Sequence, residues 1–200
     1  RHRGGPDEGG SLTFDNHAGS SAELFAIFFI QTSENLMPPD TPDLDRTDLQ
    51  ILALLQQDGR IANTRLAEAV HLSPTAVLAR VQRLTKDTLI LGYEARLNPR
   101  KLRAGLLVFV EVLLDRTTPN VFDEFKAAVQ VRDEIMECHM VAGGFDYLLK
   151  TRHADMDGYR DFAGRVLWQL PGVRETRSYA VMEEVKHSAH LDLAPARLQL

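Results

Sequence analysis

The fold is decided by the stretch LSPTAVLARVQRLTKD, Leu72 to Asp87, in which a helix-start signal precedes an amphipathic run. Ser73 suits the N-cap position because its hydroxyl can accept a free backbone N–H, and Pro74 suits the first helical position because it has no N–H to leave unpaired. At 100° per residue, one face of the predicted helix is apolar and comprises Val77, Val81 and Leu84. We expect that face to pack and the opposite face to point outward.

The outward face is small near its start and cationic farther along, and it comprises Thr75, Ala76, Ala79, Arg83 and Lys86, with Arg80 on the flank. Small side chains allow a helix to approach a DNA groove closely, and cations suit phosphates. The competing interpretation is an ordinary surface helix with a basic face, because such faces are common. This helix alone does not decide between the two.

Two shorter helices are predicted before this stretch. Leu49, Leu52 and Leu55 recur at helical spacing, after a capping pair formed by Asp45 and Asp48, until Asp58-Gly59 ends the helix. Asn63 is expected to cap a second helix with Leu66, Ala67 and Val70 on one side. Three short helices with a short turn before the last predict a helix-turn-helix. A β-prone stretch, residues 89–97, then predicts a strand or wing.

The second half of the chain predicts the order strand, helix, strand, strand, helix, strand. The segments are a strand at 106–114, a helix after Thr118-Pro119, strands at 135–142 and 145–151, a helix from the Asp155 cap to Pro171-Gly172, and a strand from Val173 to about Val185. This order predicts an α+β, ferredoxin-like βαββαβ domain with helices on one sheet face. The first strand is apolar on both alternations, so we expect a second subunit to cover the other face.

The composition, 44% hydrophobic and 26% charged among 200 residues, is that of an ordinary globular protein. The net charge of −5 argues against a generally basic coat for nucleic acid, although residues 40–103 are net positive, with ten cations against eight acids. One cysteine excludes a disulfide framework and a Cys-based zinc site within one chain, and favours a cytoplasmic protein. The longest apolar run, Leu24 to Ile30, is too short for a membrane span, so no membrane partner is expected.

Residues 1–40 are rich in Gly, Ser, Asp and His, and we expect them to be a disordered or non-native extension. Met37, which stands before Pro38 and Pro39, is a plausible native start. The alternative is a short interaction arm that uses the cluster of Phe25, Phe28 and Phe29.

Seven segments between residues 43 and 190 resemble the Lrp/AsnC family of prokaryotic transcription factors. They are LDRTDLQIL at 44–52, DGRI at 58–61, LSPTAVLARVQRL at 72–84, LLVFVEV at 106–112, ECHMVAGGFDYLLKTR at 137–152, LPGV at 170–173 and VMEEVK at 181–186. The resemblance implies an N-terminal winged helix-turn-helix and a C-terminal RAM domain that dimerises, assembles further and binds an amino acid. The implied bounds are 43–98 for the winged helix-turn-helix, 99–105 for a linker, 106–190 for the RAM domain and 191–200 for a tail.

For DNA, the resemblance implies that Ser73, Pro74 and Thr75 begin the recognition helix and that Arg80 and Arg83 are its basic positions. We expect Thr75 and Arg83 to contact bases or phosphates, and Arg80, Lys86 and the linker cations to contact phosphates. One departure is Thr88, where many relatives have Gly; this puts the turn after the helix in question, because Gly permits φ > 0.

The hairpin VAGGFDY, residues 141–147, is the candidate effector site. Gly143 and Gly144 expose backbone N–H groups to a carboxylate, and Asp146 supplies an acceptor for an ammonium group. The alternative is that Gly-Gly only makes a tight hairpin turn. By resemblance the pocket also includes Met140, Tyr147, Met156, Tyr179, Ala180 and Val181. Ala180 is smaller than the residue often found there, so the effector is leucine or another amino acid.

No catalytic or metal-binding constellation is predicted. Cys138 and His139 are neighbours on a strand, so their side chains point to opposite faces, and a buried inert thiol is expected. The histidines lack metal-ligand spacing, and Glu183 and Glu184 also diverge on a strand.

The predicted function is therefore a nucleoid-associated, sequence-specific regulator of amino-acid metabolism, not an enzyme, without a cofactor. It would bind double-stranded DNA as a homodimer that assembles to an octamer, and an amino acid at the RAM-domain interface would modulate it. The rivals are an architectural DNA-wrapping protein without a ligand response and an amino-acid-binding subunit of an enzyme; the two helix arginines argue against the latter.

Overall fold

The computed structural model describes residues 43–117 and 119–194, so the expectations for residues 1–40 and for the end of the tail lie outside the described residues. The described residues form a helical part and a sheet part. The helical part contains α2 (Arg46–Gln57), α3 (Asn63–Ala69) and α4 (Pro74–Lys86). The sheet part contains β1 (Leu106–Leu114), α5 (Val121–Gln130), β2 (Ile135–Met140), β3 (Tyr147–His153), α6 (Met156–Arg165), the 3-10 turn η1 (Leu167–Gln169) and β4 (Val173–Ala180).

The starts of α2 and α4 confirm the predicted caps. The N–H of Asp48 donates to Asp45 Oδ1 over 2.8 Å, and the N–H of Asp45 donates to Asp48 Oδ2 over 3.1 Å, which is a complete capping box. Ser73 Oγ accepts the N–H of Ala76 over 3.2 Å, and Pro74 is the first residue of α4. Both helix starts therefore satisfy backbone donors that would otherwise lack a partner.

The predicted cap of α3 is wrong, because Ala62 holds the N-cap position and Asn63 is already inside the helix. The Asn63 side chain donates instead to the carbonyl of Pro74 over 2.8 Å. This hydrogen bond joins the start of α3 to the start of α4, so the Asn63 amide links the two helices and does not cap α3. Sequence spacing alone does not show that alternative partner.

A small apolar core holds the three helices together. Its buried members are Ile51, Leu66, Ala67, Val70, Val77 and Leu84. Val77 and Leu84 are fully buried and Val81 is half-buried, so the predicted inner face of α4 is the one that packs. Because the inner face is used in this way, the opposite face of α4 is left for solvent or a partner.

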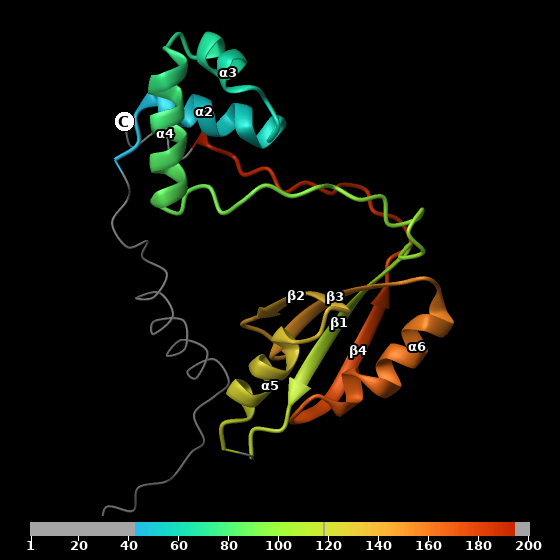
Figure 1. Ribbon diagram of the computed structural model, residues 1–200. Coiled ribbons are helices and arrows are strands. Elements are labelled where there is room, and N and C mark those ends of the chain that lie inside the picture. The colour runs from blue at the N-terminus through green and yellow to red at the C-terminus, as the bar shows by residue number, and fades with distance from the viewer. Residues whose placement is uncertain (1–42, 118, 195–200) are drawn as a thin grey trace, which may run out of the picture. The chain divides into compact units, whose positions relative to one another are not determined.

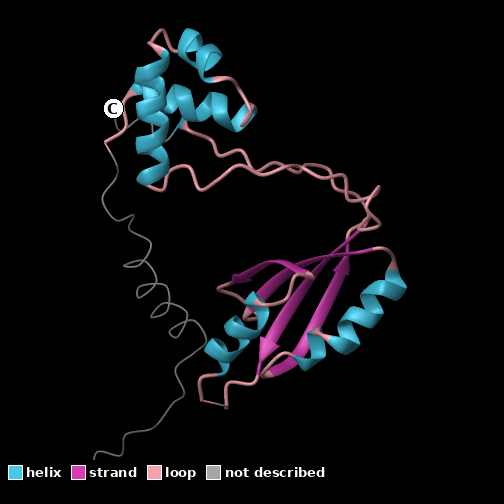
Figure 2. Ribbon diagram, viewed as in Figure 1, coloured by secondary structure: helices cyan, strands magenta, loops and turns pink. Residues whose placement is uncertain are grey.

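The stretch 89–97 forms no strand in the described chain, contrary to the prediction, and Figure 2 draws it as a loop. A strand needs backbone partners for its N–H and C=O groups. Among the described residues, the backbone of residues 91–97 makes no hydrogen bond to another segment. Thr88, directly before this stretch, has a φ of 59°. The turn therefore uses the left-handed conformation for which Gly is usually selected.

The sheet part confirms the βαββαβ order. Its strands are all antiparallel and lie in the order β2-β3-β1-β4, with β1 in the centre. In register, Val110 on β1 lies opposite Leu149 on β3 and Ser178 on β4. Helices α5 and α6 lie over the same face of the sheet (Figure 1). The fold is therefore the expected α+β sandwich of one sheet and one helical layer.

The core between the sheet and these helices contains the alternate residues of β1, namely Val108, Val110, Val112 and Leu114, together with Phe125, Phe162 and Leu167. Gly172 makes the turn into β4 with a φ of 70°. A Cβ on Gly172 would lie 2.0 Å from Val121 Cγ2, so this position has no room for a side chain. The predicted helix does not run to Pro171-Gly172, because α6 ends at Arg165 and the separate 3-10 turn η1 ends at Gln169. Gly172 is nevertheless required sterically in the turn into β4.

The face of the sheet opposite the helices is mixed. β1 contributes the half-buried Phe109 and the half-buried carboxylate of Glu111 there, and the neighbouring strands contribute polar and charged side chains. Lys150 Nζ donates to Glu137 Oε1 over 2.6 Å, and the Tyr179 hydroxyl donates to Glu111 over 3.0 Å. The expectation of an apolar open face therefore holds only in part, because the carboxylate of Glu111 lies on the central strand itself, on the same face as Phe109.

Candidate DNA-contact and effector sites

The outer face of α4 is exposed along the whole helix. Ser73, Pro74 and Thr75 are exposed at its start, and Lys86 is exposed at its end. Between them Leu78, Ala79 and Gln82 are also exposed, while Ala76 is half-buried. Four of the predicted DNA-contact residues therefore lie on one accessible surface of the helix, with small side chains near its N-terminus.

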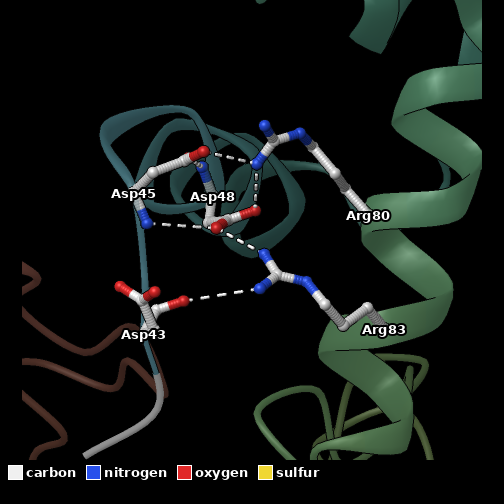
Figure 3. A network of polar contacts seen from close by, with 5 residues as sticks. All are labelled: Asp43, Asp45, Asp48, Arg80 and Arg83. Atoms are coloured by element: carbon white, nitrogen blue, oxygen red, sulfur yellow. Dashed lines mark hydrogen bonds and ion pairs between the residues drawn. The ribbon is translucent and has the colours of Figure 1, made fainter.

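The other two predicted contact residues, Arg80 and Arg83, take part in a network with the start of α2 (Figure 3). Arg80 donates through Nη1 to Asp45 Oδ2 over 2.7 Å and to Asp48 Oδ1 over 2.8 Å. Arg83 donates through Nη2 to Asp48 Oδ2 over 2.5 Å. The two arginines are therefore anchored by carboxylates, an arrangement that the helical periodicity did not reveal.

The charges in this network affect one another. Partial burial would raise the pKa of Asp45, but the N–H of Asp48 and the Arg80 guanidinium outweigh that effect and lower it. The hydrogen bonds from Asp45 and Asp48 raise the pKa of Arg80, and the hydrogen bond to Asp48 raises that of Arg83. Both arginines thus stay charged, and their charge is balanced locally.

The turn between β2 and β3 presents an open surface. A Cβ placed on Gly143 or Gly144 would meet no atom within 4 Å, and neither glycine has a positive φ. A two-residue hairpin turn of the common types would require a positive φ. The glycines therefore do not serve the tight-turn geometry considered as the alternative, and they leave the backbone of the turn accessible.

Asp146, the predicted acceptor for an ammonium group, is only 4% exposed. Its Oδ2 accepts the N–H of Leu114 over 2.8 Å, and its Oδ1 accepts from Arg116 Nη2 over 2.5 Å. The carboxylate thus ties the turn to the end of β1. Arg116 was not among the site residues predicted from the sequence, although its position just after a central strand could have indicated it.

Tyr147, also predicted at the effector site, belongs to the core. Its side chain is 2% exposed, and its ring centroid lies 4.6 Å from that of Phe125. The hydroxyl is buried and has no hydrogen-bond partner among the described residues. Burial raises the pKa of Tyr147 to about 12. In this conformation the side chain packs under α5 and is not at the surface.

The predicted effector residues fall into two groups at opposite ends of the sheet. Met140, Gly143, Gly144, Asp146 and Tyr147 lie at the end where Tyr147 pairs with Val112, whereas Met156, Tyr179, Ala180 and Val181 lie at the end where Ala180 pairs with Val108. Four residues of strand separate these levels of β1, which is about 13 Å. One sheet does not bring the two groups together.

Neither a metal site nor a membrane-spanning helix is found in the described residues. Cys138 pairs in register with Leu149 on the core side of the sheet and is half-buried, and burial raises the pKa of its thiol. His139, its neighbour, is exposed and hydrogen-bonds to Glu137. The two side chains therefore diverge, as the strand geometry predicted.

Comparison with known proteins matches both parts of the chain. Residues 44–85 match the AsnC-type helix-turn-helix domain, and residues 107–191 match the Lrp/AsnC ligand-binding domain. The leucine-responsive regulatory protein of Salmonella typhimurium is 58% identical over 149 residues, which cover 74% of this chain and 91% of that protein. The protein of the same name from Escherichia coli is 57% identical over the same length and the same shares of both chains.

Two solved structures extend the comparison. A transcriptional regulator from Neisseria meningitidis in complex with L-Met has a TM-score of 0.73 and 33% identity, covering 76% of this chain and 99% of that chain. A feast or famine regulatory protein from Mycobacterium tuberculosis complexed with L-methionine has a TM-score of 0.68 and 32% identity, covering 74% of this chain and 98% of that chain. The chain therefore belongs to the Lrp/AsnC family of DNA-binding transcriptional regulators, which are not enzymes, and its sheet part is the family's amino-acid-responsive ligand-binding domain.

Proposed function

We propose that this regulator binds its operator through the outer face of α4 and that an amino acid, bound between subunits of a homo-oligomer, shifts its affinity for DNA. The observation that supports the DNA step is the exposed face of α4, which begins at the Ser73 cap and includes Thr75 and Lys86. Small side chains at the N-terminal end of a recognition helix allow it to lie in the major groove. Lys86, at the other end, is suited to a phosphate.

The effector site that we propose combines the two separated groups of residues across a subunit boundary. The β2–β3 turn offers accessible backbone N–H groups at Gly143 and Gly144 for a carboxylate. The opposite end of the sheet offers the exposed side chains of Met156 and Tyr179, which are 57% and 49% exposed and suit an apolar side chain. Because these groups lie about 13 Å apart within one chain, a small amino acid would touch both only if a second copy supplied one of them.

The effector that we propose is an apolar amino acid. Two relatives are named for their response to leucine, and two structural relatives are complexed with methionine. Both side chains are unbranched at Cβ and similar in volume, and the methionines near the turn and on α6 are themselves adaptable apolar contacts. The Asp146 carboxylate already accepts two hydrogen bonds, so the ammonium group would have to share it with Arg116.

The assembly that we propose is a homodimer that associates further, to an octamer, through the open sheet face and the effector turns. A dimer places two copies of α4 on one operator, and a ligand that prefers one assembly over another shifts DNA affinity by that preference alone. The site of action is then the cytoplasm, where the nucleoid is.

One experiment tests this proposal. Duplexes selected by the full-length protein from a random pool are titrated at several salt concentrations, with and without each of the twenty amino acids. We expect a sequence preference, a negative salt dependence and a change of affinity with leucine, methionine or a similar amino acid. An unchanged affinity with all twenty would leave the architectural DNA-wrapping role, and absence of binding to any duplex would contradict the DNA-binding role.

A further inference from the structure

Asp48 is a carboxylate buried where α2 meets α4. Only 1% of its side chain is exposed, and both of its oxygens are used. Oδ1 accepts from Arg80, while Oδ2 accepts from Arg83 and from the N–H of Asp45. Capping α2 uses only the hydrogen bond from the N–H of Asp45, so the two ion pairs are additional to the cap. A buried carboxylate without such partners would be strongly disfavoured.

Both arginines remain partly accessible while they are held. Their side chains are 30% exposed for Arg80 and 43% exposed for Arg83. A guanidinium has five N–H donors, and Arg80 donates through Nη1 alone. Within the described residues, its Nη2 and Nε groups make no hydrogen bond. Arg83 is held through Nη2 by Asp48 and through Nη1 by the carbonyl of Asp43 over 3.4 Å. Both arginines are therefore anchored, and Arg80 retains the larger share of its donors at the surface of α4.

The charges of the network cancel. Asp45 and Asp48 carry two negative charges, and Arg80 and Arg83 carry two positive charges. The salt dependence of DNA binding reports how many phosphates the cations of a protein neutralise. An arginine whose charge is already balanced contributes donors at fixed positions, and it contributes little to the release of counterions.

We propose that Asp48 is a positioning residue for the DNA contact. It fixes the directions of Arg80 and Arg83 and balances their charge, so that α4 recognises DNA by the geometry of its donors more than by net charge. Fixed donors suit one arrangement of phosphates and bases, whereas released arginines would follow the phosphates of any sequence. The proposal rests on the proposed function, because it requires that α4 contacts DNA.

The test uses full-length Asp48→Asn, which keeps the shape of the side chain and removes its charge. Binding to the selected duplex and to a scrambled duplex is titrated at several salt concentrations. If each protomer of a dimer gains one or two phosphate contacts, the slope of log affinity against log salt becomes steeper by about two to four. The ratio of selected to scrambled affinity falls at the same time, because the gained contacts are common to both duplexes.

The matched control is Asp87→Asn, which removes the same charge from an exposed residue at the C-cap of α4. Within the described residues Asp87 forms no ion pair with either arginine, and its charge attracts Arg83 only weakly from a distance. The slope and ratio of Asp87→Asn should therefore change far less than those of Asp48→Asn. The proposal is overturned if Asp48→Asn leaves the slope unchanged, weakens both duplexes equally, or matches the control.

A second variant keeps the proposal testable if Asp48→Asn does not fold, as judged by circular dichroism. Asp45→Asn retains a good N-cap and loosens Arg80 alone, so its slope should steepen by about one to two in a dimer. An unchanged slope in a folded Asp45→Asn protein overturns the proposal. Binding by the parent protein is measured first, and its absence contradicts the proposed function itself.

Discussion

At the scale of single residues, Thr88 holds a conformation that its side chain does not favour. It is β-branched, and its φ is 59°. The left-handed region costs an L-residue about 1–2 kcal/mol. A glycine avoids this cost, but it loses more chain entropy on folding, and that loss offsets part of the gain in stability. We expect Thr88→Gly to raise the free energy of unfolding of the helical part by about 1 kcal/mol, measured by urea unfolding. Thr85→Gly, inside α4, is the control and should lower the free energy of unfolding by a few tenths of a kcal/mol (about 0.3–0.5), the difference between the helix propensities of Thr and Gly.

Tyr147 offers a second test, because its hydroxyl is buried without a partner among the described residues. An unsatisfied buried polar group costs about 1–3 kcal/mol, so Tyr147→Phe should leave stability unchanged or raise it. Amino-acid affinity, measured by calorimetry, should not change, because the side chain belongs to the core. The stability and amino-acid affinity of Tyr147→Phe are compared with those of Tyr179→Phe, which removes an exposed hydroxyl bonded to Glu111. Loss of amino-acid affinity in a folded Tyr147→Phe protein would show that the Tyr147 hydroxyl takes part in the effector site.

At the scale of elements, His153 links β3 to α6. Its ring lies 4.9 Å from Phe162 and 5.3 Å from Tyr159, and its Nε2 is 3.0 Å from the Thr151 hydroxyl. Burial lowers the pKa of His153 below its ordinary value of 6.5, and the charge of Glu134 opposes that shift only in part. The folded state therefore prefers the neutral ring.

The sign of the resulting pH dependence follows from that preference. Well above pH 6.5 the His153 ring is neutral in both the folded and the unfolded state. As the pH falls, the unfolded chain takes up the proton first, which stabilises the unfolded state. Stability should therefore decline from pH 6.5 down to the lower pKa of the folded state and then level off. His153→Gln should remove this part of the decline in thermal unfolding measured between pH 7.5 and pH 5, whereas the exposed His190→Gln should keep it.

The helices and strands also show which parts of the fold are readable from sequence. The caps at Asp45, Ser73 and Asp155 were predicted and are present, because each depends on residues three positions apart. The cap at Asn63 was not found because the Asn63 amide bonds to the distant Pro74 instead, and the strand at 89–97 was not found because a strand needs a partner distant in sequence. Local chemistry was therefore predicted well, and the choice of a distant partner was not.

At the scale of the whole molecule, the proposed effector site requires a second copy. Phe109 lies in the centre of the open sheet face, half-buried and opposite Tyr179 and Lys150. A carboxylate there would oppose association through this face, because a dimer would bury the charge. We expect Phe109→Asp to be monomeric by light scattering, to keep its circular dichroism spectrum, and to lose most of its amino-acid affinity. A monomer with full affinity would show that one chain forms the site.

The sequence by itself determined the α+β order, the helix-turn-helix, the inner face of α4 and the family, because periodicity, caps and matched segments are local properties of the chain. Only the tertiary structure decided how the candidate site residues are used. It pairs Arg80 and Arg83 with Asp48, ties Asp146 to Arg116, buries Tyr147, and places the effector residues at opposite ends of the sheet. A side chain's role depends on what stands opposite it, and folding brings those partners from 30 or more positions away.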